Sequence, residues 1–380
     1  MLMGCLSAAM EPRIDFLQLV ERDVTVEIML CLCDPADVVH AGAVSRIWRQ
    51  CMIENGISKQ LCLRKFPQLS SVARIVEQGC KMNESSVVGS SNSDFETLRR
   101  DHRVYASLLQ ALETLALSPS DCIDYAIGAS STDNYPLESI ANTLYPRERY
   151  LNRASYWSSK GQRKPDVPET LIYRLKADFA VVTEIKIQPF EAYFQPGKPI
   201  YSAKSVRFRM GHPKSSKEID CLDVPTDQPA DEKFVWTYTS EEFPMSQENR
   251  MQTFKLPEPV LCIGGYLQIE LLGRVQRQEM DDLFYICVCH VKVLGRPLSP
   301  AFEIEMLEQS GKFSMVYSPE TLKPMLQSLG EGEDHEASSR LSEQEVRHIG
   351  FLGYLLGGYQ PDGELLEWDD NEEIDAALAL

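Results

Sequence analysis

The chain has 380 residues, of which 43% are hydrophobic and 25% are charged, proportions typical of a globular protein rather than a disordered one. The formal net charge is -18 at pH 7, so Coulomb repulsion argues against nucleic acid or an anionic membrane as the main partner. No apolar run approaches the roughly 18 residues of a membrane span, and the N-terminus lacks the basic region of a signal peptide. The 11 cysteines lie mostly in apolar segments, which favours reduced core residues in the cytoplasm or nucleus.

The sequence predicts a small helical domain at residues 16–66, after a flexible N-terminus at 1–15. The stretch "VERDVTVEIMLCL" places apolar residues on one stripe of a first helix. Asp34 is a helix N-cap followed by Pro35 at the first helical position, and a further apolar face begins at Val44. Three such short helices are too few to bury their apolar area alone, so the domain should pack on the rest of the chain or on a partner.

Helical spacing continues through "NGISKQLCLRKFPQLSSVARIVEQG" and resumes before "SPSD". It predicts a helical linker at 67–118 with a Ser-rich loop at 81–94. From about Cys122 to Leu298 the apolar residues alternate, as in "VVTEIKIQPF" and "YLQIELLGR", which predicts an antiparallel β-sandwich at 119–305 with a core of its own. A mixed helical and loop extension at 306–360 and an acidic, disordered tail at 361–380 follow. The predicted fold class is therefore multidomain α + β.

The stretch from Phe16 to Met52 resembles the F-box, the helical motif that docks on the Skp-type adaptor of cullin-based ubiquitin ligases. The matching residues are Leu19, Val20, Asp23 and Val24, then "EIMLCL", "DPADVVHAGAV" and "VSRIWR". Family members usually open with Leu-Pro, whereas this chain has Val20 and Glu21 there, a departure that weakens the start of the helix. The resemblance implies a Skp-type adaptor as partner and, through it, a cullin.

Carried over by position, the resemblance assigns adaptor binding to apolar residues of the first helices and the turns after them. These residues are Val20, Val24, Ile28, Leu32, Pro35, Val38, Val39 and Val44. Trp48 and Ile47 are expected to pack within the F-box domain instead of contacting the adaptor.

A second resemblance runs from "IGASSTDNYP" through "SYWSSKG" to the strands around "LIYRL" and "EIKIQP". This order is similar to discoidin-like, galactose-binding-like jelly rolls, and the chain as a whole looks like a plant F-box protein with a Tyr-Trp-Ser-Ser-Lys-Gly core. The jelly-roll family binds ligands in loops at one end of the sandwich, which implies possible target-binding residues Ser130, Asp133, Asn134, Tyr156, Trp157 and Ser158. In the other interpretation Tyr156 and Trp157 plug the end of the barrel, and the sequence favours this packing role.

No catalytic constellation is recognisable, and the sequence predicts neither an enzyme nor a cofactor. "CVCH" at Cys287–His290 puts two thiols on one strand face, but no second Cys/His pair has the spacing of a zinc site, so core cysteines and no metal are expected.

Two functions remain open on the sequence. The first is a receptor subunit of a Skp-cullin-F-box ubiquitin ligase whose sandwich captures an unknown protein or glycoprotein target. The second is a glycan- or protein-binding jelly roll whose N-terminal helices are a structural cap. Joint exposure of Val24, Ile28 and Val44 would favour the first, and their burial on the sandwich the second.

Overall fold

The computed structural model describes residues 15–32, 34–79, 90–146, 154–215, 230–307 and 311–328. The chain divides into two compact units, Met1–Gly332 and Glu333–Leu380, and every described residue lies in the first. The predicted acidic tail at 361–380, residues 329–360 of the predicted extension and residues 1–14 lie outside the described residues. Within the described ranges, no helix is both long enough and apolar enough to span a lipid bilayer.

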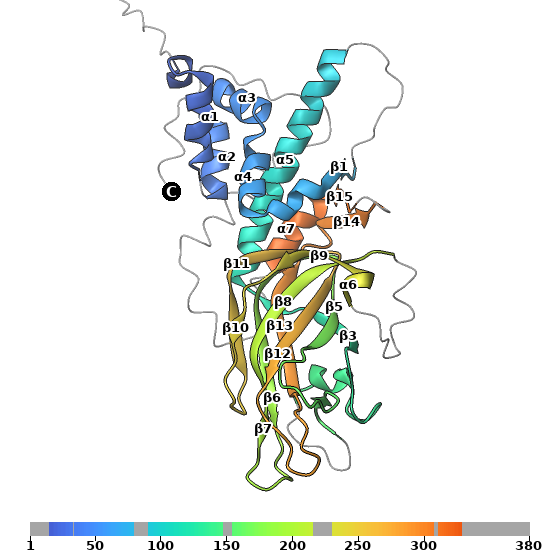
Figure 1. Ribbon diagram of the computed structural model, residues 1–380. Helices are drawn as coiled ribbons and strands as arrows, with labels where there is room; N and C mark the ends of the chain where they lie inside the picture. Colours follow the sequence, from blue (N-terminus) through green and yellow to red (C-terminus); the bar gives the residue numbers. More distant parts are fainter. Residues whose placement is uncertain are drawn as a thin grey trace, which may run out of the picture. The chain divides into compact units, whose positions relative to one another are not determined.

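Short helices follow one another at the start of the chain (Figure 1). They are η1 (Phe16–Gln18), α1 (Arg22–Leu30), α2 (Pro35–Val44), α3 (Arg46–Glu54), α4 (Ile57–Lys65) and η2 (Pro67–Ser71). The Asp34 carboxylate caps α2 by accepting a hydrogen bond from the backbone N of Ala36 at 2.8 Å. The Ser45 hydroxyl caps α3 in the same way, at 3.2 Å from the backbone N of Trp48. One residue thus ends α2 and begins α3, which fixes the sharp turn between them.

The predicted helical linker differs from the observed structure in two places. The stretch after η2 forms strand β1 (Val72–Glu77), and the long helix α5 (Ser90–Leu117) begins inside the predicted loop at 81–94. β1 pairs in parallel with β15 (Phe313–Tyr317), which also pairs with β14 (Phe302–Met306) in antiparallel fashion. The linker prediction was wrong at β1 because the partner strand lies far along the chain, where local spacing gives no signal.

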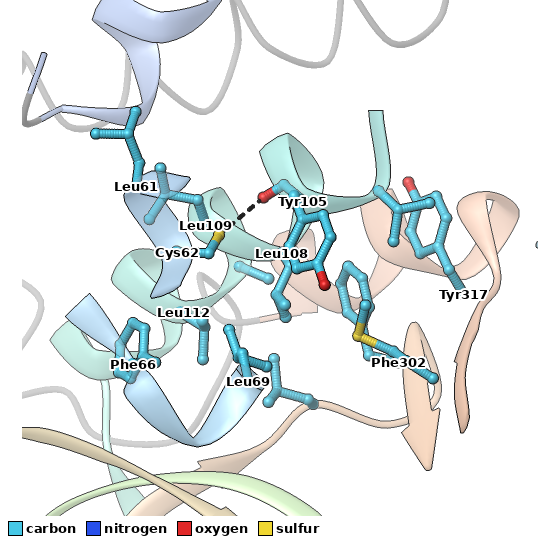
Figure 2. Packing of buried hydrophobic residues seen from close by; sticks show 14 of the residues in the cluster. Leu61, Cys62, Phe66, Leu69, Tyr105, Leu108, Leu109, Leu112, Phe302 and Tyr317 are labelled. Atoms are coloured by element: carbon cyan, nitrogen blue, oxygen red, sulfur yellow. Dashed lines mark hydrogen bonds between the residues drawn. The ribbon is translucent and has the colours of Figure 1, made fainter. Parts of the chain in front are cut away.

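Figure 2 shows the hydrophobic cluster that joins these elements. Leu108 and Leu112 of α5 pack among side chains of α4, η2, β14 and β15, and α7 (Pro319–Gln327) adds Leu322 and Leu326. The buried Tyr317 hydroxyl donates to the Ser107 hydroxyl at 3.0 Å, so its polar end is satisfied inside the cluster. Segments from both ends of the described chain therefore share one core around α5.

Two antiparallel sheets form the predicted β-sandwich (Figure 1). One has the order β10-β8-β12-β5-β3 with β9 beside β8, and the other the order β11-β6-β13-β2 with β4 beside β13 and β7 beside β6. The bounds are β2 (Ser120–Asp121), β3 (Ile123–Ala129), η3 (Ile140–Leu144), β4 (Trp157–Ser158), β5 (Glu169–Leu175), β6 (Phe179–Glu191), β7 (Ile200–Tyr201), β8 (Ala203–Pro213), α6 (Ala230–Lys233), β9 (Phe234–Thr239), β10 (Phe243–Pro244), β11 (Gln252–Ile263), β12 (Tyr266–Arg274) and β13 (Cys287–Pro297). The fold class predicted from the sequence is confirmed.

Alternate residues of the strands fill the space between the sheets. Phe208 and Ile269 of one sheet lie in the same buried cluster as Ile185 and Val291 of the other. At the ends of β6 and β11, however, Phe179, Val181, Leu261 and Ile263 belong to the cluster around α5. The sandwich thus has the expected core between its sheets, and in addition the opposite face of these strand ends packs on the cluster around α5.

Candidate binding sites

Asp15 joins η1 to the turn between α2 and α3. Its carboxylate accepts hydrogen bonds from the Ser45 hydroxyl at 2.6 Å, the Trp48 indole Nε1 at 3.0 Å and the backbone N of Leu17 at 3.0 Å. The bond from Ser45 holds the pKa of Asp15 below its ordinary value, against the opposing effect of burial. The half-buried Trp48 ring packs against the core cluster, in the packing position expected for it.

Three of the apolar residues assigned to adaptor binding are exposed. Val24 is 45%, Ile28 36% and Val44 62% accessible. Val24 and Ile28 are four residues apart on α1 and so share one face, while Thr25 and Met29 on the same helix are buried. The N-terminal helices therefore present an apolar surface, here called the helical face: Phe16, Leu19, Val24, Ile28, Val44 and Ile47.

The structure corrects other members of the assigned set. Pro35 and Val38 are buried, Val38 within the core cluster, so neither side chain is available to a partner. Ile47, expected to pack inside, is exposed. Val20, Leu32 and Val39 are half-buried. The sequence pattern identified the apolar positions but did not show which side of each short helix packs against α5. For this reason it did not predict that Phe16, Leu19 and Ile47 are exposed.

At the sandwich, the predicted loop residues divide into buried and exposed groups. Trp157 is fully buried, and its Nε1 donates to the backbone O of Ser131 at 3.1 Å and to the Thr132 hydroxyl at 3.3 Å. Ser158 is buried beside it on β4. Trp157 and Ser158 therefore have the packing role, and their assignment as target-binding residues was wrong. Ser130, Asp133 and Asn134 are exposed.

Tyr156 belongs to a group of aromatic rings at the same loops. Its ring stacks on Phe190 with centroids 3.7 Å apart, and Phe190 lies 6.2 Å from both Tyr193 and Phe194. The Asn142 side chain donates to the backbone O of Tyr156 at 2.9 Å and of Leu137 at 2.8 Å, which ties these two backbone segments together. We call Leu137, Tyr156, Phe190, Tyr193 and Phe194 the loop-end patch.

A buried ion pair fixes the loops behind this patch. Arg274 and Glu169 pair with side chains 0% and 3% accessible. Glu169 accepts hydrogen bonds from the Ser130 hydroxyl and, at 2.8 Å, from the Ser131 hydroxyl. The other guanidinium donors reach the Ser159 hydroxyl at 2.9 Å and the backbone O of Lys160, Phe284 and Val167 at 3.0, 3.1 and 3.1 Å. One arginine thus ties together loops that are far apart in the sequence.

Sequence reasoning missed this pair. By simple alternation Arg274 would point outward with Gln268 and Glu270, away from the buried Leu267, Ile269 and Leu271. Gln268 and Glu270 are nevertheless buried as well, and Gly273, which precedes Arg274, has φ +71°, a left-handed conformation. A glycine before a charged residue at the end of an apolar strand was the available signal.

Carboxylates surround the loop-end patch. The Tyr156 hydroxyl donates to Glu138 at 3.0 Å, and Tyr285 donates to Asp281. Burial and then the negative charge of Asp281 raise the pKa of Asp133, an effect that Lys160 opposes. Within the described ranges, Asp133, Glu138 and Asp281 form no ion pair. Glu138 therefore places a carboxylate directly beside the Tyr156 ring, while Lys160 partly offsets the charge of Asp133.

Comparison with known proteins found a relative but no matching family model. An F-box protein of Arabidopsis thaliana is 50% identical over 308 residues, which span 79% of this chain and 81% of the relative. Among solved structures, a CBM32 domain of a family 31 glycoside hydrolase from Clostridium perfringens covers 48% of this chain and 94% of its own, with 12% identity and a TM-score of 0.30. The family 32 carbohydrate-binding module of Streptococcus pneumoniae EndoD covers 46% and 98%, with 12% identity and a TM-score of 0.30.

Proposed function

The chain belongs to the F-box proteins, and from this premise we propose that it is a non-catalytic receptor subunit of a Skp-cullin-F-box ubiquitin ligase. Its N-terminal helices dock on the Skp-type adaptor, which links it to the cullin, and its sandwich holds a target protein. Catalysis is by proximity, since a bound target has a high effective concentration of lysine near the ubiquitin-carrying enzyme. The proposed compartment is the cytoplasm or nucleus.

The observation that carries the proposal is the joint exposure of Val24, Ile28 and Val44. Burying apolar area is worth roughly 25 cal/mol per Å² removed from water, so an exposed aliphatic surface favours association. A purely structural cap would instead bury these side chains against the rest of the chain. The helical face therefore supports adaptor docking over the alternative in which the helices only cover the sandwich.

The test is co-purification of the adaptor with a double variant, Val24→Asp with Ile28→Asp. Both positions are exposed, so the fold should tolerate the change, while two carboxylates desolvated in a contact should abolish it. The matched control is Leu117→Asp, an exposed position at the C-terminal end of α5. Loss of the adaptor from the double variant alone, with unchanged thermal unfolding, is expected. Undiminished adaptor recovery with the double variant would overturn the proposal.

A further inference from the structure

The loop-end patch combines the exposed side chains of Leu137, Tyr193 and Phe194 with the half-buried Tyr156 and the buried Phe190 of β6. Phe194 and Leu137 are 58% and 64% accessible, and Tyr193 is also exposed. The Tyr156 ring stacks on Phe190, whose centroid lies 6.2 Å from those of Tyr193 and Phe194, and Asn142 holds the backbone of Leu137 and Tyr156. Rings positioned by a rigid support are typical of recognition surfaces, because little side-chain freedom is lost on binding.

The charge around the patch restricts what it can bind. Glu138 contacts Tyr156 directly, and Asp133 lies beside β4, where its backbone N donates to the Ser158 O at 3.0 Å. Burial, and after it the charges of Glu138 and Asp133, raise the pKa of the Cys287 thiol, so both carboxylates act on the same end of β13. An acidic or phosphorylated ligand would be repelled by Glu138, and a neutral sugar would form no ion pair with it.

A positively charged group of a ligand would interact favourably with both the carboxylates and the aromatic rings of the loop-end patch. An ammonium or guanidinium group is attracted to carboxylates and to aromatic faces, and its alkyl stem covers apolar surface. The net charge of -18 also favours encounter with a basic partner. We propose that the loop-end patch binds a basic segment of the target protein, in which a lysine or arginine lies next to a hydrophobic side chain. This inference rests on the proposed function, because it names the class of target that the sandwich captures.

The test uses the purified full chain without adaptor, so the result does not depend on the helical face. An array of randomised 12-residue peptides is probed with the native chain, and an array of oligosaccharides is probed in parallel. Enrichment of peptides with Arg or Lys beside Leu, Phe or Tyr is the expected result. Enrichment of acidic peptides, binding to sugars alone, or no binding to either array would overturn the inference.

Variants locate the binding on the protein. The strongest peptide from the array is labelled with fluorescein, and its affinity is measured by anisotropy. Phe194→Ser, and Glu138→Gln together with Asp133→Asn, should each weaken binding by about tenfold, and the double charge variant should also reduce the salt dependence. The amide at position 138 keeps an acceptor for the Tyr156 hydroxyl.

Matched controls are Val235→Ser on β9 and Glu258→Gln on β11, both exposed and outside the patch. They should bind like the native chain. Equal losses in the controls and the patch variants would place the peptide elsewhere and contradict the inference. Adaptor co-purification with the same variants should be unchanged, which separates a failure here from a failure of the proposed function.

Discussion

The helical face and the loop-end patch are both exposed and apolar, yet they differ in chemistry and in how they are held. The helical face is mainly aliphatic, and its geometry depends on helix caps and on the Asp15 contacts to Ser45 and Trp48. The loop-end patch is mainly aromatic, has the Glu138 carboxylate beside it, and is held by ring stacking and by Asn142 hydrogen bonds to the backbone. The helical face suits a partner that binds by burying apolar area, whereas the loop-end patch favours positively charged ligands over negatively charged ones.

The largest expected effect comes from breaking the buried Arg274–Glu169 ion pair that ties the sandwich loops together. Arg274→Met leaves Glu169 buried without a counter-charge and should lower the free energy of unfolding by about 3–5 kcal/mol. Arg277→Met, which breaks an exposed pair with Asp282, should cost less than about 1 kcal/mol. Urea titration measures both. If the two variants are equally stable, the ion pair does not hold the loops.

A second pair of variants distinguishes a side chain that stabilises the sandwich loops from one that is expected to bind the target. Trp157→Ala removes a fully buried side chain and should cost about 3–5 kcal/mol. Phe194→Ala is at an exposed position and should cost less than about 1 kcal/mol while weakening target binding. Thermal unfolding of both variants is the measurement, and a small loss for Trp157→Ala would contradict its packing role.

A third prediction concerns the pH dependence of the helical region. Burial, with the charges of Arg49 and Arg103, lowers the pKa of His102 to about 4, and its Nδ1 lies 3.0 Å from the Ser58 hydroxyl. Because the folded pKa lies below the unfolded one, the unfolded chain binds the proton first, and stability falls as the pH drops from about 7 to 5.

The His102 contribution over this range should be about 1–2 kcal/mol. The variant His102→Gln should remove it, so its unfolding free energy should change less between pH 7 and pH 5 than that of the native chain. His40→Gln, at an exposed position on α2, is the control and should keep the native pH profile. Identical profiles for His102→Gln and the native chain would rule out this role.

The smallest expected effect tests the departure from the family pattern. Glu21 is the N-cap of α1 with φ -64°, which is the φ that proline fixes. Val20→Leu with Glu21→Pro should strengthen adaptor binding by about 1 kcal/mol, through a pre-organised backbone and one added methylene. Calorimetric titration with the adaptor measures the gain, and Val20→Leu alone isolates the methylene. Weaker binding of the double variant would show that Glu21 itself is needed.

The fold was predictable where local patterns decide it. Asp34 with Pro35 marked the start of α2, and alternation marked strands such as β6 and β12. Strand β1 was not predictable, because "VARIVE" becomes a strand only through its pairing with β15. The shared core at Phe179 and Leu261 also depends on a packing partner, α5, that alternation does not reveal.

The candidate sites were predictable as segments but not as side chains. The F-box resemblance located the exposed Val24, Ile28 and Val44, but also included the buried Val38, since apolar character alone does not distinguish core from contact. The jelly-roll resemblance located the loops that meet at the patch. Arg274 was missed because alternation alone does not reveal that this face of β12 is covered, so that Gln268, Glu270 and Arg274 are all buried.

Hydrogen exchange of the full chain with and without the Skp-type adaptor tests whether the N-terminal helices are the docking surface. Slower amide exchange is expected at η1, α1 and the turn between α2 and α3, around Phe16, Val24 and Val44, and no change is expected around Leu137 and Phe194 in the sandwich loops. Protection of the sandwich loops by the adaptor, or no protection of α1 at adaptor concentrations that saturate an unrelated F-box protein, would contradict adaptor docking on these helices.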